Sequence, residues 1–128
     1  MITIKNIIIS LVLSLVLTLF HELIASLLMG IKDKNDIKIV ILANLITNPC
    51  VVYISNLLVI FSNRIVLYIS VAIMEISVII IEGIIFKKYL KYDKISPYNV
   101  SLINNFVSFF MGNIFNLIGL SGLIFSLF

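Results

Sequence analysis

Hydrophobic residues occur in four long blocks along this chain, separated only by short polar segments. Each block is long enough to cross a hydrocarbon core of about 30 Å at about 1.5 Å per helical residue. The pattern predicts membrane-spanning helices over residues 6–30, 37–61, 65–86 and 99–127. We therefore expect an all-α polytopic membrane protein with short loops, in which residues 1–128 form a single transmembrane domain.

Composition supports this class and excludes several others. Apolar residues make up 62% of the chain and charged residues only 12%, whereas soluble domains have about a quarter charged residues. The net charge of +3 is no nucleic-acid signal, because the lysines cluster in and beside the predicted loops. Cys50 is the only cysteine, which excludes an intrachain disulfide and a zinc-type cysteine cluster. We expect no cofactor. Lysine outnumbers arginine eight to one, a bias that favours an AT-rich bacterial source.

Basic residues are distributed unequally between the two ends of the predicted bundle. Short cytoplasmic loops of membrane proteins carry an excess of lysine and arginine. The end with the 31–36 and 87–98 loops has seven basic residues: Lys32, Lys34, Lys38, Lys87, Lys88, Lys91 and Lys94. The opposite end has only Lys5 and Arg64. This predicts a multi-pass protein of the cell membrane, with loops 31–36 and 87–98 in the cytoplasm and both termini outside.

Polar residues interrupt all four predicted spans, although a charge at the centre of a span costs about 2.5–3.5 kcal/mol on insertion scales. From the helix ends, their depth is roughly 6–15 Å below the cytoplasmic side, at about 1.5 Å per residue. They therefore share one slab in the cytoplasmic half of the membrane. We take them as the candidate residues for binding a substrate or ion: Glu22, Asn44, Asn48, Glu75, Glu82, Asn104 and Asn105.

The acidic residues of the third span have helical spacing. Glu75 and Glu82 are seven residues apart, so they lie within about 20° of each other around a helix. A carboxyl group removed from water favours its neutral form, and Glu75, near the membrane centre, is the best candidate to exchange a proton. Alternatively, these acids bond neighbouring helices and hold an assembly together. Glu82 is shallow enough to reach interfacial water.

The segment NLITNPC, residues 44–50, places amides and a proline inside the second span. Asn44, Thr47 and Asn48 share one helix face by their i, i+3, i+4 spacing. Pro49 lacks an N–H, so the carbonyl of Leu45 loses its helical partner and needs another. These oxygens suit a hard cation. For Pro49 itself, the favoured interpretation is a kink that serves packing alone.

A histidine precedes the acid of the first span, in LFHELIAS. This is not the HExxH zinc motif, because Ala25 stands four residues after His21. His21 could ligate a metal or carry protons. The favoured interpretation is structural: Glu22 pairs inward with an amide while His21 borders another helix or lipid. Since no GxSxG motif or Ser/His pairing is evident either, we do not expect an enzyme.

The two halves of the chain show a faint internal similarity. A shift of 60 residues aligns four pairs: Glu22 with Glu82, Asp33 with Asp93, Lys34 with Lys94, and Asn44 with Asn104. A duplication would give two parallel two-helix repeats related by an axis along the membrane normal. Chance similarity in an apolar sequence explains the alignment equally simply.

Two functional hypotheses follow from the polar slab. In the first, the chain is a small transport protein whose acids and amides bind a cation, a proton or a protonated small substrate. Four helices rarely enclose a pathway alone, so a homodimer or a complex with other membrane subunits is expected. In the second, the chain is a non-catalytic membrane subunit whose buried polar residues pair with helices of other subunits. Both hypotheses place the protein in the lipid bilayer without nucleic acid as a partner.

Overall fold

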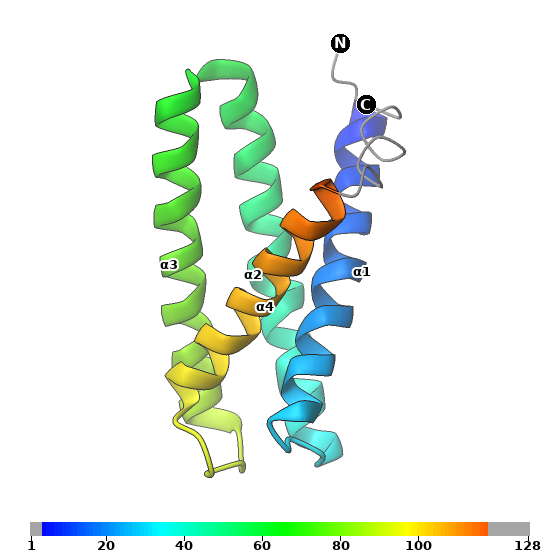
Figure 1. Ribbon diagram of the computed structural model, residues 1–128, viewed down its shortest axis with the longest axis vertical. Coiled ribbons are helices and arrows are strands. Elements are labelled where there is room, and N and C mark those ends of the chain that lie inside the picture. The colour runs from blue at the N-terminus through cyan, green and yellow to red at the C-terminus, as the bar shows by residue number, and fades with distance from the viewer. Residues whose placement is uncertain (1–3, 118–128) are drawn as a thin grey trace.

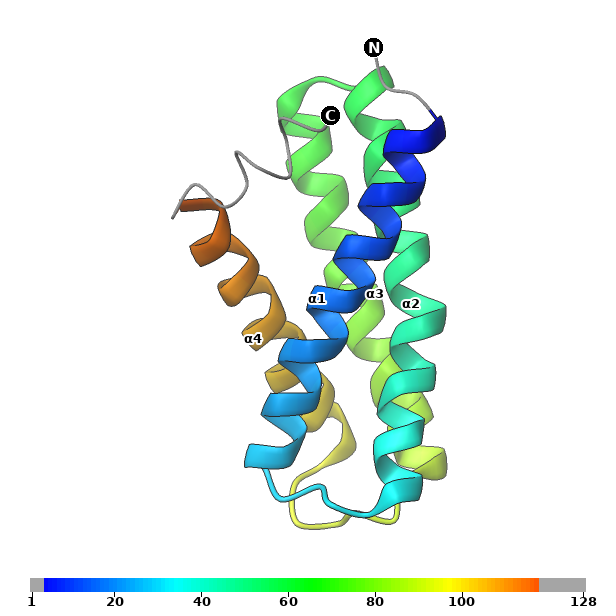
Figure 2. The ribbon, with the colours of Figure 1, turned by 90° about the vertical axis from the view of Figure 1, so that its right-hand side faces the viewer.

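Four α-helices in antiparallel succession make up the part of the chain that the structure describes, residues 4–117 of a computed structural model (Figure 1). They are α1 (Ile4–Leu28), α2 (Lys34–Phe61), α3 (Arg64–Tyr89) and α4 (Pro97–Leu117), and this range contains no strand. Contacts run around a ring in which each helix touches two neighbours and none touches the diagonal helix within the described residues. Helix α4 is inclined, and its far end leans away from the other helices (Figure 2).

Three of these helices, α1, α2 and α3, are long and apolar enough to cross a membrane by length and composition. The described residues are therefore those of an all-helical membrane protein. The predicted fourth span, 99–127, begins within α4, and its last ten positions lie outside the described residues.

Helix α2 begins at Lys34, three residues before the predicted start, because Asp33 caps it. The Asp33 carboxylate accepts hydrogen bonds from the backbone N–H groups of Asn35 at 2.9 Å and Asp36 at 3.3 Å. An aspartate at this position satisfies donors that have no partner within the helix. The helix then continues through Pro49 to Phe61.

The end of α1 and the start of α4 also follow from local chemistry. Helix α1 ends at Leu28, two residues before the predicted end, because Gly30 adopts φ 93° and closes the last turn. The N–H of Ile31 then donates to the Ser26 carbonyl at 3.0 Å, as in a Schellman motif. Helix α4 begins at Pro97, two residues before the predicted start, since proline fits the first helical position.

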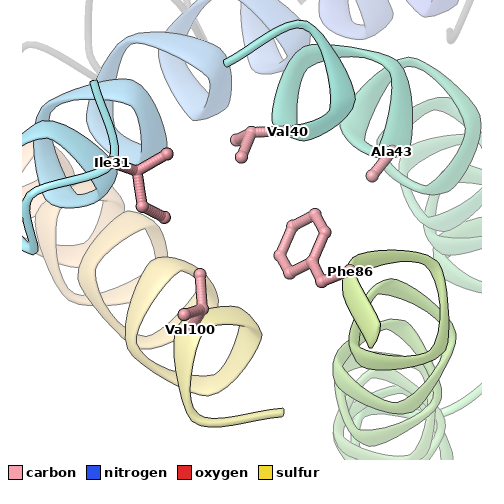
Figure 3. Close-up of a cluster of buried hydrophobic side chains, with 5 residues drawn as sticks. All are labelled: Ile31, Val40, Ala43, Phe86 and Val100. Carbon is pink, nitrogen blue, oxygen red and sulfur yellow. The ribbon is translucent and has the colours of Figure 1, made fainter. Parts of the chain in front are cut away.

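An apolar core lies at the lysine-rich end of the bundle, where the two polar loops join the helices. Every helix or its end contributes a side chain, and Figure 3 shows these side chains converging: Ile31, Val40, Ala43, Phe86 and Val100. Each is at most 1% exposed. This core fixes the four helices relative to one another next to the candidate site.

A buried aspartate in the first turn of α2 binds the α3–α4 loop. The Asp36 carboxylate, only 3% exposed, accepts hydrogen bonds from the backbone N–H groups of Lys91 at 2.9 Å and Tyr92 at 3.1 Å. The Tyr92 hydroxyl in turn donates to the Met29 carbonyl in the α1–α2 loop at 2.6 Å. These bonds tie the start of α2 and the α1–α2 loop to the α3–α4 loop, which the sequence does not predict.

Helices α3 and α4 approach closely at Gly83. A Cβ atom at this position would overlap the ring of Tyr98, with the ring Cε1 only 2.8 Å away. We expect Gly83→Ala to lower the free energy of unfolding by about 1 kcal/mol, because Tyr98 is partly exposed and its ring can shift. Thermal unfolding in detergent, followed by circular dichroism, measures this change.

The matched control is Gly112→Ala, because a Cβ there would meet no atom within 4 Å. Adding Tyr98→Ala to Gly83→Ala should remove most of the penalty. Equal effects of the two glycine substitutions would contradict the close approach of the helices.

Candidate functional site

Buried polar side chains from all four helices form a layer directly beside the apolar core. We call this set the polar layer: Glu22, Ser26, Asn44, Thr47, Glu82, Ser101, Asn104 and Asn105. No member is more than 7% exposed. The spacing of residues along each helix places the polar layer next to the apolar core. Asn44 lies one turn after the core residue Val40, and Glu82 lies one turn before the core residue Phe86.

Glu82 is the most heavily bonded member of the polar layer. One carboxylate oxygen, Oε1, accepts from the Thr47 hydroxyl at 2.8 Å. The other, Oε2, accepts from the Asn105 amide at 2.6 Å and from the Ser101 hydroxyl at 3.2 Å. Glu82 thus joins α3 to α2 and α4, and three donors facing one carboxylate suit an ionised, acceptor-only group.

Glu22 is equally buried but far less well bonded. Its Oε2 accepts from the Asn44 amide at 2.5 Å, and the same amide nitrogen donates to the Val40 carbonyl at 3.2 Å. Its Oε1 has no hydrogen-bond partner in the described part of the chain, although Glu22 is 0% exposed. Buried polar atoms are nearly always bonded, so an orphan oxygen calls for an explanation such as a bound ion or water.

The polar layer carries acidic groups without lysine or arginine to balance them. Glu22 lies within electrostatic range of Glu82 and, more weakly, of Glu75. All nine lysines and arginines of the chain lie at or near the helix ends and in the loops. Negative charge in this layer is therefore best balanced by a proton or by a positively charged ligand.

A separate pair within the polar layer joins α1 to α4. The Asn104 amide donates to the Ser26 hydroxyl at 2.9 Å, and that hydroxyl lies 3.3 Å from the amide oxygen of Asn104. Asn104 therefore bonds Ser26, whereas Asn44, its counterpart in the proposed repeat, bonds Glu22. The acid of the second half, Glu82, is bonded by Asn105 instead. The repeat stays a prediction.

Two of the predicted site residues lie outside the polar layer. The Asn48 amide donates to the Thr18 hydroxyl at 2.9 Å, and its oxygen lies 3.5 Å from the Ser14 hydroxyl, which bridges α1 and α2 farther from the loops. Glu75 is half-buried, makes no hydrogen bond within residues 4–117, and is repelled by the charge of Glu82. The other five predicted residues all belong to the layer.

Two serines of the layer were not among the predicted site residues, although they complete the hydrogen bonding. Ser26 lies four residues after Glu22, and Ser101 lies four residues before Asn105. Such spacing places each hydroxyl on the same helix face as an acid or amide. This periodicity was the signal that could have identified them.

His21 is buried at 5% exposure and lies edge-on to the Phe20 ring, with 5.7 Å between the ring centres. Within the described residues, no group of three histidine, cysteine, aspartate or glutamate side chains is arranged to hold a metal ion.

An apolar groove of about 220 Å³ runs between α2 and α3. Its lining includes Cys50, Ile54, Met74 and Val78, together with Thr47. Because the Thr47 hydroxyl also donates to Glu82, this residue links the groove to the polar layer.

Comparisons with protein-family models, with curated proteins and with solved structures give no match.

Proposed function

We propose that this chain is a small integral membrane transport protein whose polar layer binds a cation, a proton or a protonated small substrate. The observation that carries the proposal is the burial of two carboxyl groups, Glu22 and Glu82, in a layer without lysine or arginine. Ionisable groups at membrane depth are expensive, and they characteristically mark ion and proton pathways.

Amides supply the neutral part of this site. Asn44 and Asn105 each donate to one of the two glutamates, and Asn104 extends the layer across α1 and α4. Asn48 and Glu75 lie one and two helical turns farther from the lysine-rich end, at positions that suit a route toward the layer.

The arrangement in the membrane is part of the proposal. We place α4 and the residues after it as a fourth span, and the lysine-rich end in the cytoplasm. All seven lysines at this end are exposed, as the positive-inside rule and contact with anionic lipid require. The polar layer then lies in the cytoplasmic half of the bilayer, with both termini outside.

The internal bonding of the layer favours transport over the role of a non-catalytic subunit. A subunit that pairs its polar residues with partner helices would present them on its outer surface. Here the polar layer is at most 7% exposed, and the hydrogen bonds of Glu82 join helices of the same chain. The outer surface instead carries large apolar side chains, which suit lipid or a second copy in a homodimer.

Uptake by the purified chain tests this proposal. We expect vesicles of phosphatidylcholine and phosphatidylglycerol that contain the protein to take up labelled Na⁺, K⁺ or a protonated amine, or to conduct protons, under a membrane potential. Uptake should saturate with concentration and exceed that of protein-free vesicles. Absence of all these fluxes, with native mass spectrometry showing a fixed complex with other membrane proteins, would favour the subunit role.

A further inference from the structure

We infer that the two buried glutamates have different roles: Glu82 is a fixed negative charge, and Glu22 presents its free oxygen to a small monovalent cation, with Na⁺ as the best fit. The inference rests on the proposed function and narrows its ligand class. It comes from the unequal hydrogen bonding of two side chains that are both 0% exposed.

The bonding of Glu82 leaves it little capacity for a ligand. Both of its oxygens are engaged, by donors from Thr47, Ser101 and Asn105. A cation that displaced these donors would break three hydrogen bonds to a charged group, each worth about 1.5–3 kcal/mol. Glu82 therefore contributes its charge to the site without direct contact.

The free oxygen of Glu22 is a buried acceptor without a hydrogen-bond donor in the described residues. A proton on Oε1, directed at the nearby Ser108 hydroxyl, is one way to complete the site. A cation in contact with Oε1 is the other, and the neighbouring charge of Glu82 favours a positive ligand. The experiments below distinguish the cation from the proton.

Burial and charge define the class of cation. Because Oε1 is closed off from the surface, its partner has lost most of its water and must be small. Only one carboxylate oxygen is unengaged, which is poor coordination for a divalent ion, since such ions usually require several carboxylates or retained waters. The Ser108 hydroxyl lies within interaction range of Glu22 and could supply a neutral oxygen, the ligand atom that hard cations take.

Thermal stability in Na⁺ tests this inference on the full chain in detergent. Replacing choline by Na⁺ at constant ionic strength should raise the midpoint of unfolding in a saturable way, because a ligand that binds only the folded state stabilises it. K⁺ should raise the midpoint less. Equal midpoints in Na⁺, K⁺ and choline would overturn the inference.

Two variants test whether Glu22 is responsible for the Na⁺-dependent rise in the midpoint of unfolding. Glu22→Gln should abolish the Na⁺-dependent rise, because it removes the charge while keeping an acceptor for Asn44. Asp93→Asn should retain the rise, because it neutralises an exposed loop acid outside the polar layer. A rise that persists in Glu22→Gln would overturn the assignment to this residue.

Equilibrium binding of ²²Na⁺ to the wild-type chain provides a measurement that does not depend on any variant folding. We expect binding of about one ion per chain, displaced by unlabelled Na⁺ and not by choline, as the single free carboxylate oxygen implies. Absence of binding would overturn the inference and assign the orphan oxygen to a water.

The uptake experiment separates this inference from the proposed function. Glu22-dependent flux of protons or of an amine without Na⁺ binding would overturn the Na⁺ assignment and leave transport standing. Na⁺ binding without any flux would support the site and contradict transport.

Discussion

Replacing Glu82 by leucine should lower the free energy of unfolding by about 3 kcal/mol or more, a larger loss than we expect from any other single substitution in the polar layer. The carboxylate accepts hydrogen bonds from Thr47, Ser101 and Asn105, and all three donors are buried. Hydrogen bonds to a charged group contribute about 1.5–3 kcal/mol each, although Thr47 and Asn105 keep backbone acceptors at Ala43 and Ser101. The loss also disconnects α3 from α2 and α4 in this layer.

Unfolding by increasing mole fraction of a denaturing detergent, followed by circular dichroism, measures this effect. The matched control is Glu75→Leu on the same helix, which we expect to change the free energy of unfolding by less than about 1 kcal/mol. Glu75 is half-buried and makes no hydrogen bond within the described residues, so its removal leaves no donor without an acceptor. Similar losses for both variants would contradict a specific role of Glu82 in linking the helices.

The sequence predicts most of the fold for a simple physical reason. An apolar block of about 20 residues in lipid must satisfy its own backbone hydrogen bonds, and a helix does so with local contacts alone. Three of the predicted spans therefore correspond to helices of membrane-spanning length and composition. Helix ends differ by two or three residues where a cap such as Asp33 or Gly30 determines the boundary.

Contacts between loops could not be predicted in the same way. By sequence, Asp36 is an ordinary acid in the first turn of α2. In the structure it accepts hydrogen bonds from the backbone N–H groups of Lys91 and Tyr92, which lie 55 and 56 residues later in the chain. Such a bond depends on where a helix end and a distant loop meet in space, and no local pattern contains that information.

The sequence predicts the membrane depth and the residue types of the candidate site. It does not predict which side chains form hydrogen bonds with one another. Depth follows from counting residues along each span, and it places acids and amides of four helices together. Pairing depends on the rotation and tilt of each helix. Helix α4 is inclined, and Asn105 rather than Asn104 bonds Glu82. The hydrogen-bonded part of the layer likewise centres on Glu22 and Glu82, whereas Glu75, favoured by the sequence, lies outside it.

Neutralising Glu22 should reduce transport by about 100-fold while leaving the fold intact. Glutamine has almost the same shape as glutamate and keeps an oxygen that can accept from Asn44. It removes the charge whose free oxygen faces the proposed ligand. Loss of one partner of a buried charged contact costs about 2–5 kcal/mol, and about 2.8 kcal/mol corresponds to a factor of about 100.

The most direct test of the central claim, that the polar layer is a transport site, is the initial rate of potential-driven cation uptake in three matched vesicle preparations. These contain the wild-type chain, Glu22→Gln and Asp93→Asn, each with the helical content of the wild type verified by circular dichroism. We predict rapid uptake by the wild type and Asp93→Asn, and uptake by Glu22→Gln near that of protein-free vesicles. Equal rates in all three preparations would contradict the claim.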